Sequence, residues 1–179
     1  MPFLSFLGPR STLLEVFRAF PETSKPLIEF SEVLLRGPSP FTTAERELIA
    51  TYVSRLNQCR YCHAVHSATA ERLGIPKETL ERLAQNLECV PAKMQPVLRY
   101  AEKLTRDPGS ADKAHVDAIL ASGWDEQAVY HAVAITALFN FMNRLVEGLG
   151  IELHPGYVSS AAQRLAERGY APHLDMMKG

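Results

Sequence analysis

Apolar residues recur every three or four positions along almost the whole chain, the spacing that defines one face of an α-helix. In the segment 42–56, for example, a capping box formed by Thr42 and Glu45 precedes apolar residues at 48, 49, 52, 53 and 56. No stretch alternates convincingly at every second residue, as a half-buried β-strand would. We therefore predict an all-α protein of about eight or nine helices. The expected helices span about 12–20, 24–36, 42–56, 59–73, 76–87, 92–105, 110–121, 124–149 and 159–169.

The longest predicted helix, 124–149, is apolar nearly all the way round between Ala132 and Met142. Such a helix packs against neighbours on several sides or against another subunit. Asn140, Asn143 and Arg144 interrupt the apolar surface. We interpret these three residues as polar anchors where the helix meets solvent or another subunit.

Length and charge narrow the classes of protein to consider. A chain of 179 residues, 46% hydrophobic and 22% charged, suits a single globular domain over 1–179. The net charge of −1 gives no sign of binding to nucleic acid or an anionic membrane. No apolar run approaches the roughly 20 residues of a membrane span, and the N-terminus lacks the basic start of a signal peptide. We expect a cytoplasmic protein with neither nucleic acid nor membrane as a partner.

The candidate chemistry is concentrated in the segment 47–66. Cys59 and Cys62 form a Cys-x-x-Cys motif, and His66 follows one helical turn later, so the three side chains share one stripe of a helix. A thiol near a helix N-terminus is favoured as the reactive thiolate. His66 is placed to accept the proton of Cys62. Glu47, on the preceding predicted helix, is our candidate to orient His66 and complete a Glu–His–Cys relay.

Less reactive interpretations of the same segment stay open. Zinc is disfavoured because the four potential ligands at 59, 62, 63 and 66 span about 10 Å of helix and cannot all reach one ion, although another subunit could supply ligands. Redox chemistry is likewise favoured over purely structural burial of the two cysteines, with His66 as a core histidine. His63 has no evident partner, and we expect it to be peripheral. Cys89 is expected to be a free, partly buried thiol.

The segments 45–50 and 56–66 resemble the AhpD-like alkylhydroperoxidase branch of the carboxymuconolactone decarboxylase superfamily, and more narrowly its peroxidase-related members. The resemblance covers roughly residues 25–150, and it leaves helical arms at both ends of the chain. It rests on the combined pattern Glu-x11-Cys-x-x-Cys-x3-His, which is matched in full by Glu47, Cys59, Cys62 and His66.

This resemblance implies an AhpD-like helical fold that assembles as a trimer or hexamer, and peroxide reduction without a metal or organic cofactor. It makes Cys62 the attacking thiolate and His66 its base, with Glu47 completing the relay. Cys59 would resolve the sulfenic acid into a disulfide. In the best-known members a histidine stands immediately before the second cysteine, whereas this chain has Tyr61.

The expected function is therefore that of a thiol-dependent peroxidase. Its partners would be a hydroperoxide and a dithiol or protein reductant of unknown identity. Two alternatives are a disulfide reductase acting on a partner protein and a non-catalytic or zinc-stabilised structural member of the same fold. Lactone decarboxylation is disfavoured, because the decarboxylase branch lacks the cysteine pair.

Overall fold

The computed structural model describes residues 1–83, 85–154 and 156–177. Within these ranges the chain forms ten α-helices and three short 3-10 turns and contains no strand, so the all-α prediction is confirmed. The helices are α1 Leu13–Ala19, α2 Pro21–Arg36, α3 Thr43–Leu56, α4 Arg60–Arg72, α5 Lys77–Arg82, α6 Gln95–Arg106, α7 Lys113–Ala121, α8 Glu126–Gly148, α9 Tyr157–Arg168 and α10 Pro172–Met176.

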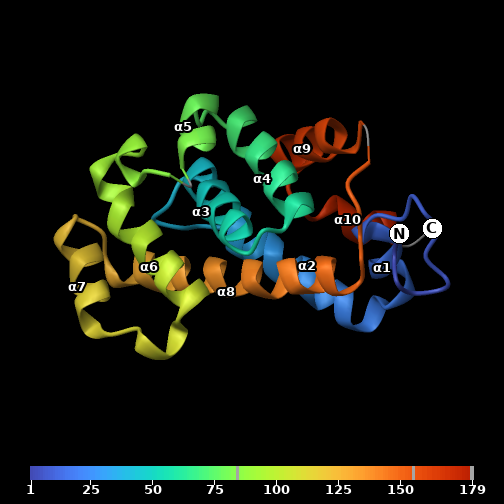
Figure 1. Cartoon of the computed structure of the whole chain (residues 1–179), viewed down its shortest axis with the longest axis horizontal. Helices are drawn as coiled ribbons and strands as arrows, with labels where there is room; N and C mark the ends of the chain where they lie inside the picture. Colours follow the sequence, from blue (N-terminus) through green and yellow to red (C-terminus); the bar gives the residue numbers. More distant parts are fainter. Residues whose placement is uncertain (84, 155, 178–179) are drawn as a thin grey trace.

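Helix α8 runs along most of the length of the molecule, and the other helices are arranged around it (Figure 1). Helices α3 and α4 form a hairpin that packs on α8, and α9 lies against α4. The N-terminus of the chain lies at the end of the molecule where α1 and α10 also lie (Figure 1). None of the helices described is long and apolar enough to cross a membrane.

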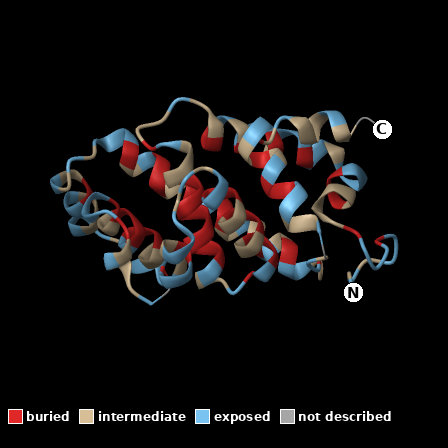
Figure 2. Cartoon of the chain, turned by 90° about the horizontal axis from the view of Figure 1, so that it is seen from above, coloured by how far each residue is buried: buried red, intermediate tan, exposed pale blue. Residues whose placement is uncertain are grey.

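Two clusters of buried apolar side chains hold the helices together. The larger one lies among α3, α6 and α8, where residues such as Ile49, Leu98 and Ile135 are completely buried. The smaller one surrounds the cysteine pair and joins α4 to α1 and α9. Figure 2 shows the buried positions on the inward faces of the helices. The predicted catalytic segment thus lies between the central helices and the two arms.

Two predicted helices differ most from the observed ones: α5 ends at Arg82 and not near residue 87, and α2 begins earlier than expected. We expected Pro21 to end one helix and the next to begin near residue 24, but α2 begins at Pro21 itself. Proline is tolerated at the first helical position because that residue's N–H has no partner within the helix. The short helix α10, which follows Ala171, was not predicted, since the segment 172–176 has almost no apolar periodicity.

Candidate active site

The centre of the site is a buried pair formed by Glu47 on α3 and His66 on α4. The side chain of Glu47 is completely buried, and its Oε2 lies 2.7 Å from Nδ1 of His66. Burial opposes ionisation of this carboxyl group, but the charges and hydrogen bonds of His66 and Arg36 hold the pKa of Glu47 below its usual value. With Nδ1 bound to a carboxylate, Nε2 of His66 is the ring nitrogen left for a reacting group.

The second oxygen of Glu47 is held by two residues that the sequence pattern did not indicate. Arg36, the last residue of α2, donates from Nη2 to Oε1 of Glu47 at 2.6 Å. The hydroxyl of Tyr170 donates to the same oxygen at 3.1 Å. Burial and the charge of Glu47 raise the pKa of Tyr170, which keeps the phenol protonated as a donor. The guanidinium of Arg36 also lies over the Tyr170 ring, 5.0 Å from its centroid.

Tyr170 is brought to the site by a turn between α9 and α10. The carboxylate of Glu32 accepts hydrogen bonds from the backbone N–H groups of Tyr170, at 2.6 Å, and of Ala171, at 3.0 Å. Gly169 has a φ of +68°, and a Cβ atom there would lie only 2.6 Å from Oε2 of Glu32. Glycine is therefore required at 169 for this turn, and the turn carries the phenol of Tyr170 inward.

The connector between α3 and α4 positions the cysteines. Its backbone forms a Schellman motif: the N–H of Cys59 donates to the carbonyl of Ser54 at 3.0 Å, and that of Gln58 to the carbonyl of Arg55 at 3.0 Å. Gln58 takes the left-handed conformation, with φ of 58°. Cys59 becomes the N-cap of α4, and Cys62 lies in its first turn, as the sequence predicted to within one residue.

The two thiols are reduced, buried and electrostatically different. A hydrogen bond from Cys59 lowers the pKa of the Cys62 thiol, although burial alone would raise it. The positive charge of His66 and a hydrogen bond from the amide of Asn143 lower this pKa further. Donating to Cys62, together with burial, raises the pKa of Cys59. Cys62 is thus the thiol of the pair that ionises first, and the thiolate is the nucleophilic form.

Asn143 on α8 is the residue for which the sequence interpretation was wrong. It is almost completely buried, not at a boundary with solvent. Its amide nitrogen donates to Oγ of Ser54 at 3.0 Å, and its oxygen accepts from Asn57 at 2.9 Å. The sequence pattern of an asparagine within an apolar helix is the same whether its side chain lies at the surface or is buried beside the active site. The sequence alone therefore did not distinguish these two positions.

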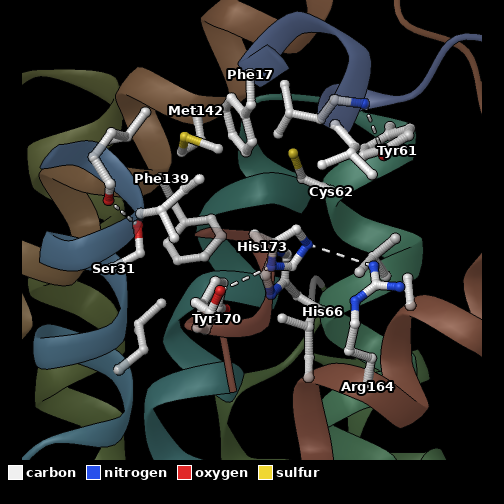
Figure 3. A pocket seen from close by; sticks show the side chains of 18 of the residues that line it. Phe17, Ser31, Tyr61, Cys62, His66, Phe139, Met142, Arg164, Tyr170 and His173 are labelled. Atoms are coloured by element: carbon white, nitrogen blue, oxygen red, sulfur yellow. Dashed lines mark hydrogen bonds between the residues drawn. The ribbon is translucent and has the colours of Figure 1, made fainter. Parts of the chain in front are cut away.

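Cys62 and His66 line one partly enclosed cavity of about 70 Å³. Its walls are largely apolar and come from α1, α2, α8 and α9 as well as α4, so both arms of the chain help to close it (Figure 3). The labelled side chains around Cys62 in this view include Phe17, Phe139 and Met142. A largely apolar lining of this kind strengthens electrostatic interactions between the groups inside.

Three further residues discussed from the sequence lie as follows. Tyr61 contacts both arms, since its hydroxyl lies 3.4 Å from the N–H of Leu13 and its ring lies 5.4 Å from that of Tyr157. His63 is half-buried beside the carbonyl of Thr51, outside the cavity lining. Cys89 is a free, half-buried thiol packed on the larger core cluster, as predicted. In the part of the chain that is described, no three potential metal ligands gather at one point.

Comparison with known proteins gives one family and several similar structures. The model of the carboxymuconolactone decarboxylase family matches residues 21–107. No curated protein is similar enough to count as a match.

A peroxidase-related protein from Silicibacter sp. TM1040 is 25% identical, with a TM-score of 0.76 over 82% of this chain and 78% of that one. The alkylhydroperoxidase AhpD core protein from Ralstonia eutropha JMP134 is 22% identical, with a TM-score of 0.75 over 80% and 76%. The debrominase Bmp8 in complex with 2,3,4-tribromopyrrole is 18% identical, with a TM-score of 0.70 over 86% and 81%. Taken together, the family match and these similarities support a relationship to the carboxymuconolactone decarboxylase superfamily and to its AhpD-like, peroxidase-related branch.

Proposed function

We propose that the protein is a thiol-dependent peroxidase that reduces organic hydroperoxides with its cysteine pair. The observation that carries this proposal is that Cys62 lines the same partly enclosed apolar cavity as His66, whose other ring nitrogen is bound by the buried Glu47. A nucleophile, a base and a group that orients the base are the parts that covalent catalysis by a thiol requires.

In the first step, the Cys62 thiolate attacks the outer oxygen of the hydroperoxide and the O–O bond breaks. The leaving alkoxide takes a proton held by His66 and departs as an alcohol, while Cys62 becomes a sulfenic acid. Cys59 then attacks the sulfenic sulfur, water leaves, and a Cys59–Cys62 disulfide forms. A dithiol supplies the two electrons and two protons that restore the pair.

Arg36 and Tyr170 act as positioning residues in this scheme. Both bind Oε1 of Glu47, so Oε2 is left to His66 and the carboxylate cannot rotate freely. The charge of Arg36 and the hydrogen bond from Tyr170 also keep the fully buried carboxylate of Glu47 ionised. Without such partners, the loss of solvation would favour the protonated form. Their expected effect is on the proton transfer through His66 and not on the binding of the peroxide.

The decisive experiment measures peroxide consumption with a dithiol donor in wild type, Cys62→Ser and the matched control Cys89→Ser. Cys62→Ser removes the proposed nucleophile, so we expect turnover to fall to the background rate. Cys89 lies in the other core cluster, and its substitution should leave the rate within about twofold. Full activity of Cys62→Ser would overturn the proposed mechanism.

A second candidate is suggested by the similarity to a debrominase. The cavity is partly enclosed and lined by aromatic and thioether side chains such as Phe139 and Met142, which suit a flat, polarisable halogenated ring. The cysteine pair could supply the two electrons that replace a carbon–bromine bond by carbon–hydrogen. Release of bromide from a brominated pyrrole in the presence of dithiol would favour this function, and its absence alongside peroxide turnover would exclude it.

A further inference from the structure

Cys59 and Cys62 are associated with two different pockets. Cys62 lines the partly enclosed apolar cavity, whereas Cys59 contributes to a separate, open pocket of about 580 Å³ on the outer surface. That volume lies within the range of roughly 300–1,000 Å³ common for small-molecule sites. The inner cavity around Cys62, of about 70 Å³, is smaller and largely apolar. The two sulfur atoms of the pair therefore border pockets of different size and polarity.

The outer pocket is positively charged. Arg55 at the end of α3, Arg60 at the start of α4 and Arg106 at the end of α6 line it, and among the described residues that do so none is acidic. Arg106 is paired with Glu102 at 2.9 Å. Arg55 and Arg60 are exposed and make no ion pair within the described part of the chain. Arg60 also lies close enough to Glu152 to help lower the pKa of that carboxyl, and the carboxylate of Glu147 interacts with Cys59. Arg55 and Arg60 nevertheless give the lining of the outer pocket a net positive charge.

The disulfide chemistry favours attack from this side. When a reductant thiolate attacks Sγ of Cys59, the S–S bond breaks and Cys62 leaves as a thiolate. Cys62 is the better leaving group, because its pKa is held below that of Cys59 and a thiol of lower pKa leaves faster. The second thiol of the reductant then attacks the reductant's own sulfur in the mixed disulfide. Cys59 is released, and the reductant becomes a cyclic disulfide.

Cys59 itself is covered in the dithiol form, with no exposed surface. The residue before it, Gln58, is exposed, lines the same pocket and holds a left-handed backbone conformation. Access to the sulfur of Cys59 therefore requires a local movement of the residues that cover it, of which Gln58 is one. His63, which also lines this pocket, would lie beside the entering reductant.

We propose that the outer pocket is the reductant site, and that Arg55 and Arg60 select a small dithiol that carries carboxylates. The inference rests on the proposed function, because it needs the Cys59–Cys62 disulfide as an intermediate. The protein then works from two faces: the peroxide reacts at Cys62 inside the cavity, and the anionic dithiol reacts at Cys59 from outside.

The test starts from full-length protein oxidised with one equivalent of an organic hydroperoxide, with the disulfide verified by the loss of two free thiols. Its reduction is timed with 2,5-dimercaptoadipate, which is anionic, and with dithiothreitol, which is uncharged; both are 1,4-dithiols that close to a six-membered cyclic disulfide. The proteins are wild type, Arg55→Gln, Arg60→Gln and the control Arg82→Gln, an exposed arginine on α5 outside the pocket. Comparing each variant with wild type for one dithiol cancels the intrinsic reactivity of that dithiol.

We expect each pocket variant to slow reduction by 2,5-dimercaptoadipate about fivefold, and reduction by dithiothreitol less than twofold. The control should change neither rate, and about 0.5 M salt should remove most of the difference between wild type and the pocket variants. Circular dichroism establishes that each variant is folded.

Equal effects on the two dithiols, or no effect on either, would overturn the anionic reductant site while leaving the peroxidase proposal intact. A protein in which the hydroperoxide produces no disulfide would instead contradict the proposed function, and the reductant site with it. The two failures are thus told apart by the first step of the same experiment.

Discussion

The two oxygens of the Glu47 carboxylate organise the site at the scale of single residues. Oε2 binds His66, and Oε1 binds both Arg36 and Tyr170. Removing a buried carboxylate from water is costly, and these partners offset that cost through charge and hydrogen bonding. The same contacts fix the direction in which His66 presents its free nitrogen. Stability and proposed catalysis therefore depend on one set of side chains, and two predictions follow from it.

The charge of Glu47 is expected to make the stability of the protein pH-dependent. Its pKa is lower in the folded state than in an unfolded chain, so its contribution is complete above about pH 4.5 and is lost as the pH falls through the folded-state pKa. Glu47→Gln, which leaves Arg36 unpaired, should lower the free energy of unfolding at pH 7 by about 2–3 kcal/mol. In urea unfolding, the difference from wild type should narrow below pH 4.5; a constant difference across the range would contradict this account.

Tyr170→Phe removes one hydrogen bond to Glu47 and keeps the aromatic ring. Without that donor, the pKa of Glu47 rises, and the acid limb of the pH–rate profile for peroxide turnover should move to higher pH. We expect turnover to fall about fivefold at neutral pH. Tyr130→Phe, at an exposed tyrosine on α8, is the matched control. A lower rate with an unshifted profile would mean that Tyr170 has only a structural role.

Among the elements, the connector between α3 and α4 matters most. Its Schellman motif turns the chain so that Cys59 caps α4 and Cys62 enters the first turn, where the helix dipole favours a thiolate. The polar side of the connector is tied to α8, because the amide of Asn57 donates to Asn143 at 2.9 Å and to Asn140 at 3.1 Å. Three helices thus determine where the cysteine pair lies.

The left-handed conformation of Gln58 gives a prediction for this element. A β-branched residue is rarely compatible with positive φ, so Gln58→Val should destabilise the protein by about 1–2 kcal/mol and slow disulfide formation. Gln58→Gly meets the same backbone requirement without a side chain and should keep the rate of disulfide formation. Unfolding curves and thiol loss after one equivalent of peroxide measure the two effects. If valine and glycine behave alike, the backbone conformation is not what positions the pair.

The whole molecule combines a family core with two arms. The matched family region, 21–107, contains Glu47, both cysteines of the motif and His66, whereas Tyr170 and part of the cavity wall come from outside it. Closure of the cavity is therefore a property of the complete chain. Several large apolar side chains are also exposed on α2 and α8, namely Phe30, Val33, Tyr130 and Phe141.

These exposed side chains agree with the expectation, still a prediction, that the protein is a homo-oligomer. Light scattering after gel filtration should give a mass three or six times the 19.9 kDa of the chain. Val33→Lys or Phe141→Lys should reduce this mass, because a charge would be buried in the interface. Glu78→Lys, on the exposed side of α5, is the control. A wild-type mass of 19.9 kDa would refute the prediction.

The sequence by itself determined the helical class and most of the helices, because apolar periodicity and capping residues act within one or two turns. It also indicated Cys59, Cys62, His66 and Glu47 as candidates, since three of these lie on one helix stripe and the fourth belongs to a spaced motif. The contact between Glu47 and His66 is present in the structure, while the catalytic roles of all four remain predictions.

Only the tertiary structure decided which other groups join Glu47. Arg36 and Tyr170 lie 11 and 123 residues from it in the chain, and Tyr170 reaches it through a glycine turn that Glu32 holds. Contacts between distant segments leave no periodic signal in a sequence, because they depend on how helices pack. The sequence did not predict the burial of Glu47 for the same reason. A glutamate beside an apolar helix face is normally solvated, whereas here His66, Arg36 and Tyr170 bind the carboxylate in place of water.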